Sequence, residues 1–88
     1  MISQGSLVSQ VPPVYPAVAR AARIQGTVVL SAVIAKDGTV ENLSLLSGHP
    51  LLVPAAMDAV KQWRYRPYTL NGQPVEVMTQ IHVNFQLQ

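Results

Sequence analysis

The sequence predicts an α+β domain in which two helices pack on one face of a three-stranded, antiparallel or mixed sheet. Apolar and polar residues alternate over 28–45 and again over 75–87, as in strands that bury one face. Between them, residues 52–63 place apolar side chains three and four positions apart, which is helical spacing. The chain has 88 residues, of which 49% are apolar and 11% charged, a length and composition that suit one folded domain.

The N-terminal part divides into a lead-in and a first helix. Residues 1–11 are small and polar, which predicts a flexible lead-in before a domain that spans 12–88. Pro16 suits the first turn of a helix, since its missing N–H is not needed there. The sequence predicts this short helix over about 16–23.

A β-hairpin follows. Residues 28–35 alternate in polarity, and Asp37 and Gly38 then provide a turn, which we predict to be of type I′. The returning strand over 40–45 is apolar at every second position except near Asn42, where the pattern predicts a small bulge.

The second half supplies a helix and a last strand. The helix is predicted over 52–63, and residues 64–74 then form a loop with a turn at Asn71 and Gly72. The last strand begins near residue 75 and continues almost to the end of the chain.

This order of helix, strand, strand, helix, strand restricts the sheet topology. A helical crossover after a hairpin leads to a third strand parallel to the second, commonly one strand width away. The third strand then pairs antiparallel with the first, and the sheet order is 2-1-3. The last strand is therefore an edge, and residues 77–88 contain no proline, glycine or formal charge that would block pairing with another chain.

Catalytic and metal sites find little support. The chain has no cysteine, its two histidines are thirty-three positions apart, and no glycine-rich phosphate loop is present. We expect His49 to hydrogen-bond to a turn. The four acidic residues are spread over the predicted elements: Asp37, Glu41, Asp58 and Glu76. The sequence therefore predicts neither an enzyme nor a bound cofactor.

Two short motifs have structural explanations. Residues 61–68 interleave basic and aromatic side chains, as in proteins that stack on single-stranded nucleic acid. With six basic residues in the whole chain, we instead expect Trp63 to anchor the core and no nucleic acid to bind. Residues 12–15 match a Pro-Pro-x-Tyr ligand motif, but Tyr15 is expected to pack on the fold.

The set of motifs resembles one known family. It comprises Tyr-Pro at the first helix, Arg-x-x-Gly at 23–26, the Asp-Gly hairpin, Ser-Gly at 47–48 and Trp-Arg-Tyr-x-Pro at 63–67. In this order and spacing the chain resembles, from about residue 13 to 87, the C-terminal domain of the TonB family of energy transducers. The resemblance implies a periplasmic domain anchored in the inner membrane by an N-terminal helix that the given chain lacks, since residues 1–88 contain neither a signal peptide nor a spanning segment.

The resemblance also implies the partners. They are TonB-dependent outer-membrane transporters, whose short TonB-box segment pairs with the last strand and is pulled at the expense of the proton gradient, so that iron chelates or cobalamin enter. The absent N-terminal part would contact the inner-membrane proton-channel complex. The implied partner-binding residues are Val77, Met78, Thr79, Gln80, Ile81, His82, Val83, Asn84 and Phe85, with Pro13, Val14 and Tyr15 nearby. The alternative is a structural module that pairs the same edge with a second copy, forming a strand-exchanged homodimer.

Overall fold

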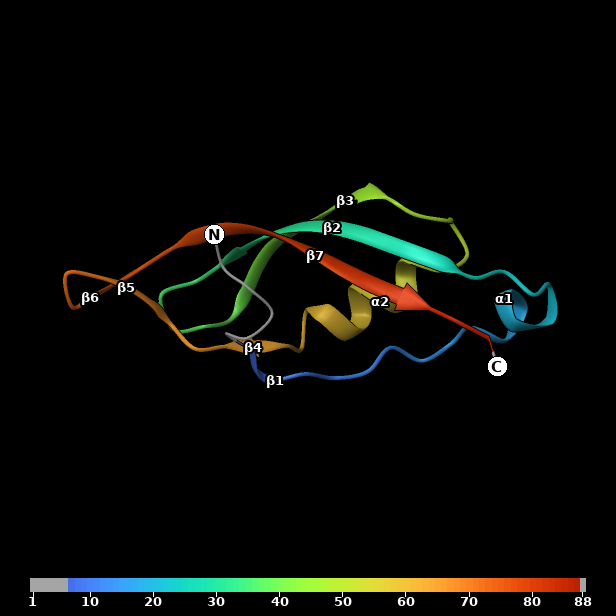
Figure 1. Cartoon of the computed structure of the whole chain (residues 1–88), viewed down its shortest axis with the longest axis horizontal. Helices are drawn as coiled ribbons and strands as arrows, with labels where there is room; N and C mark the ends of the chain where they lie inside the picture. The colour runs from blue at the N-terminus through green and yellow to red at the C-terminus, as the bar shows by residue number, and fades with distance from the viewer. Residues whose placement is uncertain (1–6, 88) are drawn as a thin grey trace.

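A three-stranded antiparallel sheet runs along the long axis of the molecule, which measures 49 × 21 × 17 Å (Figure 1). The computed structural model describes residues 7–87. The central strand β2 (Gly26–Ile34) pairs on one side with β3 (Val40–Ser47) and on the other with β7 (Val77–Phe85). The predicted α+β fold and its 2-1-3 strand order are confirmed.

The helices lie on the apolar face of this sheet. Helix α2 (Val53–Val60) packs under β2 and β3, while α1 (Ala17–Ala21) lies at the end of the sheet near the C-terminus (Figure 1). Alternation along β2 and β7 places every second side chain in the core. The core consists of Ala19, Val28, Leu30, Ala32, Ile34, Leu52, Ala56, Val60, Trp63, Tyr65, Ile81, Val83 and Phe85.

The β2–β3 hairpin differs from the predicted turn. The N–H of Gly38 donates to the carbonyl of Ala35, and the N–H of Ala35 donates to the carbonyl of Thr39, so the loop has three residues. Gly38 has a φ of 90°, whereas Asp37 has no positive φ, and the type I′ prediction is therefore wrong. The hydroxyl and N–H of Thr39 both donate to the Asp37 carboxylate, at 2.7 and 3.0 Å, and lower the pKa of Asp37. The bulge predicted at Asn42 is confirmed by its φ of 50° and a register shift there.

The segment predicted as a loop over 64–74 contains three short strands. They are β4 (Arg64–Tyr65), β5 (Tyr68–Leu70) and β6 (Gln73–Val75). β5 and β6 form a second hairpin that projects from one end of the molecule (Figure 1). Its turn has Asn71 at φ 53° and Gly72 at φ 81°, the conformation of a type I′ turn.

The end of the expected lead-in is also structured. Strand β1 (Leu7–Ser9) pairs with β4, and Leu7 packs against the core. The carbonyl of Val11 accepts a hydrogen bond of 2.8 Å from the indole N–H of Trp63. These contacts order residues that composition alone assigned to a flexible segment, because a three-residue strand is too short for a periodicity to be read from it. Residues 1–6 of that segment lie outside the described part of the chain.

Candidate partner-binding edge

Strand β7 forms one edge of the central sheet. All nine of its residues have partners on β2, from Val77 opposite Ile34 to Phe85 opposite Gly26, and this register has no bulge. Within residues 7–87 no strand pairs with the other side of β7. Its outer row of backbone groups is therefore available to a partner.

The hairpin at the other end of β2 determines which residues of β7 direct their backbone groups outward. Both backbone groups of Ala35 bond within the β2–β3 hairpin. Successive residues of a strand direct their N–H and C=O groups to opposite sides, so Ile34 directs its groups toward Val77. At the far end, the N–H of Leu87 donates to the Gln25 side chain at 2.9 Å, again on the β2 side. The odd-numbered residues of β7 thus face β2.

The nine predicted binding residues fall into two sets. One set bonds to β2 and turns its side chains to the core face: Val77, Thr79, Ile81, Val83 and Phe85. The other set directs its backbone N–H and C=O groups to the open edge and exposes its side chains on the outer face: Met78, Gln80, His82 and Asn84. A partner strand would therefore bond to the even-numbered residues.

Amide hydrogen exchange should show this alternation directly. We expect the N–H groups of Gln80 and His82 to exchange rapidly, because they have no partner in the sheet, and those of Ile81 and Val83 to be strongly protected. Two-dimensional NMR after transfer to D₂O measures these rates residue by residue. Equal protection of odd and even residues in the isolated domain would contradict an open edge.

The opposite edge of the sheet is less suited to strand addition. The pairing of β3 with β2 shifts register twice, between Val29 and Leu30 and between Ser31 and Val33. Bulges interrupt the regular row of donors and acceptors and are a common protection of edge strands. By contrast, β7 has a continuous register over its whole length.

The open edge ends at Pro74. In the two-residue type I′ hairpin, Leu70 and Gln73 form the closing hydrogen-bonded pair, so Pro74 lies at a position directed away from β5. Proline has no N–H to offer there, a placement typical of edge strands. A partner strand that continued along β6 would meet this missing donor and, before it, the charge of Glu76.

The structure brings Tyr15 to the end of β7. Its ring meets that of Phe85 edge to face, with 5.5 Å between centroids, and its hydroxyl donates to the carbonyl of Ile24. Val14 points outward with 81% of its surface exposed. Of the three residues predicted to lie near a partner, Tyr15 thus supports the strand from below, and Val14 is the one most exposed to solvent.

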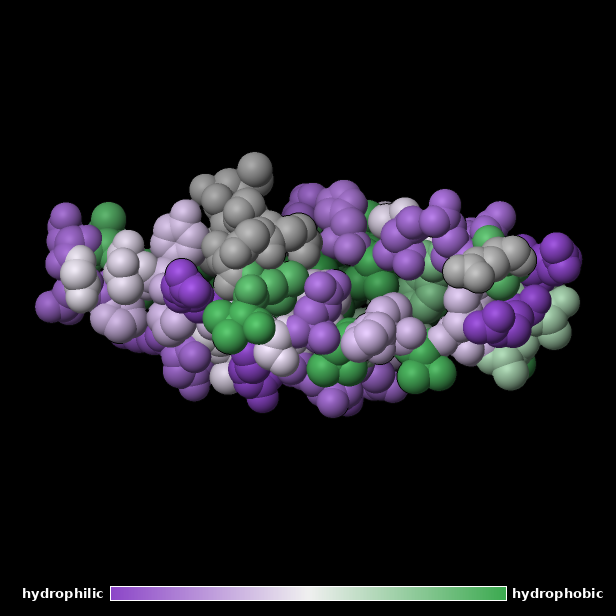
Figure 2. All heavy atoms as spheres, turned by 60° about the horizontal axis from the view of Figure 1, so that its bottom comes forward, coloured by the Kyte–Doolittle hydropathy of each residue, from purple (hydrophilic) through white to green (hydrophobic). Residues whose placement is uncertain are grey.

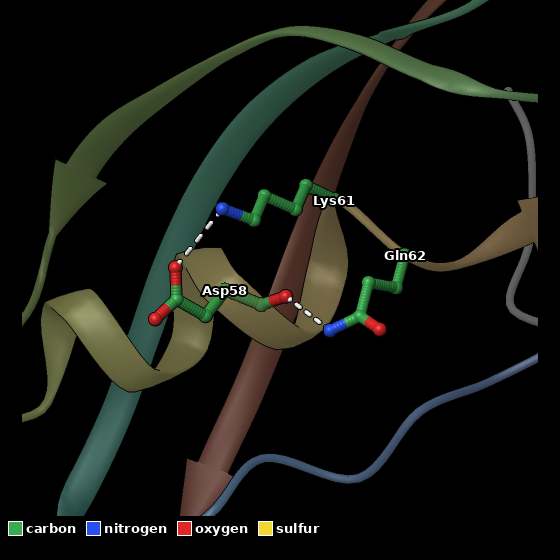
Figure 3. Close-up of polar contacts among 3 residues, drawn as sticks. All are labelled: Asp58, Lys61 and Gln62. Atoms are coloured by element: carbon green, nitrogen blue, oxygen red, sulfur yellow. Dashed lines mark hydrogen bonds and ion pairs between the residues drawn. The ribbon is translucent and has the colours of Figure 1, made fainter.

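A shallow groove of about 330 Å³ separates the segment before α1 from α2. Its lining includes Val14 and Pro16 on one side and Ala55 and Asp58 on the other. Near the end of α2, Lys61 pairs with the Asp58 carboxylate at 3.2 Å, and the Gln62 amide donates to the Asp58 carbonyl (Figure 3). On the face that carries α2, apolar side chains lie scattered among polar ones (Figure 2).

The side chains considered for other activities have structural partners. Trp63 and Tyr65 are 2% and 3% exposed, and burial raises the pKa of Tyr65, so neither ring offers a stacking surface. The Nδ1 atom of His49 accepts a hydrogen bond from the N–H of Leu51, which confirms the predicted turn contact. In the described part of the chain, no group of three potential metal ligands gathers, and no helix has the length and apolarity to cross a membrane.

Comparisons with known proteins agree with this fold. The chain is 36% identical over 91 residues to Protein TonB of Vibrio cholerae serotype O1, with all of this chain and 37% of that protein covered. It is 38% identical over 78 residues to Protein TonB of Xanthomonas campestris pv. campestris, with 86% and 35% covered. The chain thus spans little more than a third of the length of these relatives.

A solved structure and a family description complete the comparison. The solution NMR structure of the Pseudomonas aeruginosa TonB CTD superposes with a TM-score of 0.78 at 26% identity, covering 93% of this chain and 85% of that one. The family described as Gram-negative bacterial TonB protein C-terminal matches residues 11–87. The chain therefore belongs to the TonB C-terminal domain family.

Proposed function

We propose that this domain acts in the periplasm, as part of a protein anchored in the inner membrane, and binds outer-membrane transporters by adding their TonB-box strand to β7. The open backbone row of β7 carries this proposal. It rests on a regular, unbulged strand that is paired with β2 on one side only. Family membership supports the class of partner.

The geometry predicts modest and reversible affinity. The four outward residues of β7 present four N–H and four C=O groups to a partner. Each added hydrogen bond contributes about 0.5–1.5 kcal/mol net. Ordering an extended peptide and losing its translational freedom oppose this gain by several kcal/mol. Repeated capture and release of a transporter is compatible with such a balance.

The core face of β7 indicates the side chains that the partner carries. Val77 and Thr79 are half-buried at the rim of the core, and Ile81 and Val83 are buried further along. A strand added beside them places every second side chain next to this apolar layer. We therefore expect a partner segment with apolar residues at alternate positions. Its other positions, on the outer face, should accept a variety of polar residues.

In the full-length protein, this pairing delivers a pull to the transporter. An N-terminal part that contacts the inner-membrane proton-channel complex would supply the energy, and substrates such as iron chelates or cobalamin would enter. In this proposal the domain is an adaptor that binds and transmits force and itself performs no chemistry.

Replacing Gln80 with proline tests the edge. The N–H of Gln80 makes no bond within the sheet, so its loss should leave the fold intact. The ring should prevent pairing at the centre of the edge, and we expect at least about tenfold weaker binding of a transporter-box peptide, since 1.4 kcal/mol is tenfold in affinity. Isothermal titration calorimetry measures the affinity, and circular dichroism checks the fold.

The matched control is Gln80→Ala, which removes the same side chain but keeps the N–H. It should bind the peptide within about twofold of the original chain, because only the backbone pairs. If the proline variant bound the peptide as tightly as the original chain, β7 would not be the binding edge. Self-association through the same strand would instead show as concentration-dependent sedimentation without peptide, abolished by the proline variant.

A further inference from the structure

A cationic hollow lies at the end of the β7 edge. It has a volume of about 440 Å³ and is lined by Arg20, Arg23, Gln86 and Leu87, none of them acidic. Gln86 continues the outward phase of β7, since the N–H of Leu87 points to the β2 side. A strand that pairs with β7 and passes Asn84 would therefore run directly toward these two guanidinium groups.

Arg20 is held in place by an aromatic ring. Its guanidinium carbon lies 5.0 Å from the centroid of the Tyr15 ring. That ring is itself fixed by the bond from its hydroxyl to the carbonyl of Ile24 and by its contact with Phe85. Arg20 thus loses less freedom on binding an anion than a solvated arginine would.

Arg23 occupies a backbone position that favours glycine. The N–H of Arg23 donates to the carbonyl of Arg20, and the N–H of Ile24 donates to that of Ala19, which is the double bond pattern of a Schellman helix end. The residue at this position adopts a left-handed conformation, and Arg23 has a φ of 58°. An arginine here is less favourable than glycine or asparagine. The left-handed backbone closes the helix, but it does not require an arginine, so the choice of this side chain is consistent with a role of its own.

Neither arginine is neutralised within the described chain. Across residues 7–87 the one ion pair joins Lys61 to Asp58, and it involves neither arginine. Both arginines line the same hollow, and a guanidinium group can donate two parallel N–H bonds to one carboxylate.

We propose that Arg20 and Arg23 bind a carboxylate carried by the partner strand, just beyond the segment that pairs with Asn84 and Gln86. This site rests on the proposed pairing with β7 and adds a charged anchor at one end of it. The anchor would also give the pairing a direction. In a parallel partner the acidic residue follows the paired segment, and in an antiparallel partner it precedes it.

The test uses three synthetic peptides with one common transporter-box core. One has glutamate directly after the core, one has it directly before, and one has glutamine at both places. We expect only one of the two glutamate peptides to bind more tightly than the glutamine peptide, by about three- to fivefold at low ionic strength, as for an exposed but well-oriented ion pair. Added salt should reduce this advantage. Equal affinities of all three peptides would overturn the proposal.

Variants of the hollow separate binding from folding. Arg23→Gly relieves the left-handed strain, so the melting temperature should stay equal or rise while the advantage of the glutamate peptide shrinks. Arg20→Gln together with Arg23→Gly should abolish it. Arg66→Gln removes one positive charge from the connection between β4 and β5, which lies away from α1 (Figure 1), and should preserve the advantage. If Arg66→Gln reduced the advantage of the glutamate peptide equally, the advantage would come from net charge alone, and the proposed site would be wrong.

Failure of this site can be told from failure of the proposed function. If the glutamine peptide binds and Gln80→Pro abolishes its binding, pairing with β7 holds whatever the arginine variants show. If none of the three peptides binds, both the proposed pairing with β7 and the proposed carboxylate site are wrong.

Discussion

Replacing Gly38 with alanine is expected to destabilise the domain by about 2–5 kcal/mol, the sum of backbone strain and overpacking. A Cβ atom at this position would lie 2.0 Å from the carbonyl oxygen of Tyr65, and the φ of 90° is one that alanine rarely adopts. The obstacle is backbone and cannot rotate away. The carbonyl of Gly38 also accepts the N–H of Tyr65 at 2.8 Å, so the substitution disturbs the contact between the hairpin and β4.

Urea unfolding followed by circular dichroism measures this loss. Gly72→Ala is the matched control, because Gly72 has a similar φ of 81° but no atom within 4 Å of the added Cβ. It should cost about 1 kcal/mol, from conformation alone. If both variants lost the same stability, the close approach of Gly38 to Tyr65 would have no energetic weight.

Replacing Trp63 with alanine should also lower the stability of the domain by about 3–5 kcal/mol, because it removes the largest buried side chain of the core and leaves a cavity. The carbonyl of Val11 would lose its 2.8 Å bond from the indole N–H in addition. A small domain has a total stability of about 5–15 kcal/mol, so the variant should be partly unfolded at 37 °C. Circular dichroism is the suitable probe, since Trp63 is the single tryptophan and fluorescence would be lost with it.

Trp63→Phe separates the two contributions. It keeps most of the buried ring and removes the donor, and it should cost about 1–3 kcal/mol. A phenylalanine variant as unstable as the alanine variant would show that the tie to Val11, rather than the filling of the core, dominates.

The central sheet could be predicted because its signals extend over many residues. The alternation along β2 and β7 and the helical spacing of α2 each repeat several times, and burial of one face enforces them. The strand order then followed from the handedness of crossovers. The open edge at β7 is a consequence of that order, so the general location of the candidate site was also within reach.

The short elements and the details of the backbone could not be predicted from the sequence. β1 and β4 have three and two residues, too few to show a period. The β5–β6 hairpin did carry a signal, Asn71-Gly72 between possible strand residues, and it was predicted only as a turn. The outward phase of β7 depends on the three-residue loop at Gly38, which the pattern of side chains does not determine. The hollow at Arg20 and Arg23 depends on the left-handed end of α1. An arginine does not predict that conformation, which is usually indicated by glycine or asparagine.

The direction of β7 has a mechanical consequence. The strand runs along the 49 Å axis of the molecule, and a partner paired with it would lie along the same axis (Figure 1). A load applied parallel to the strands is shared by all of the added hydrogen bonds at once, whereas a load applied across them opens the bonds one after another. The same complex should therefore resist lengthwise shear far better than peeling, so a contact that dissociates readily at rest can still hold under tension.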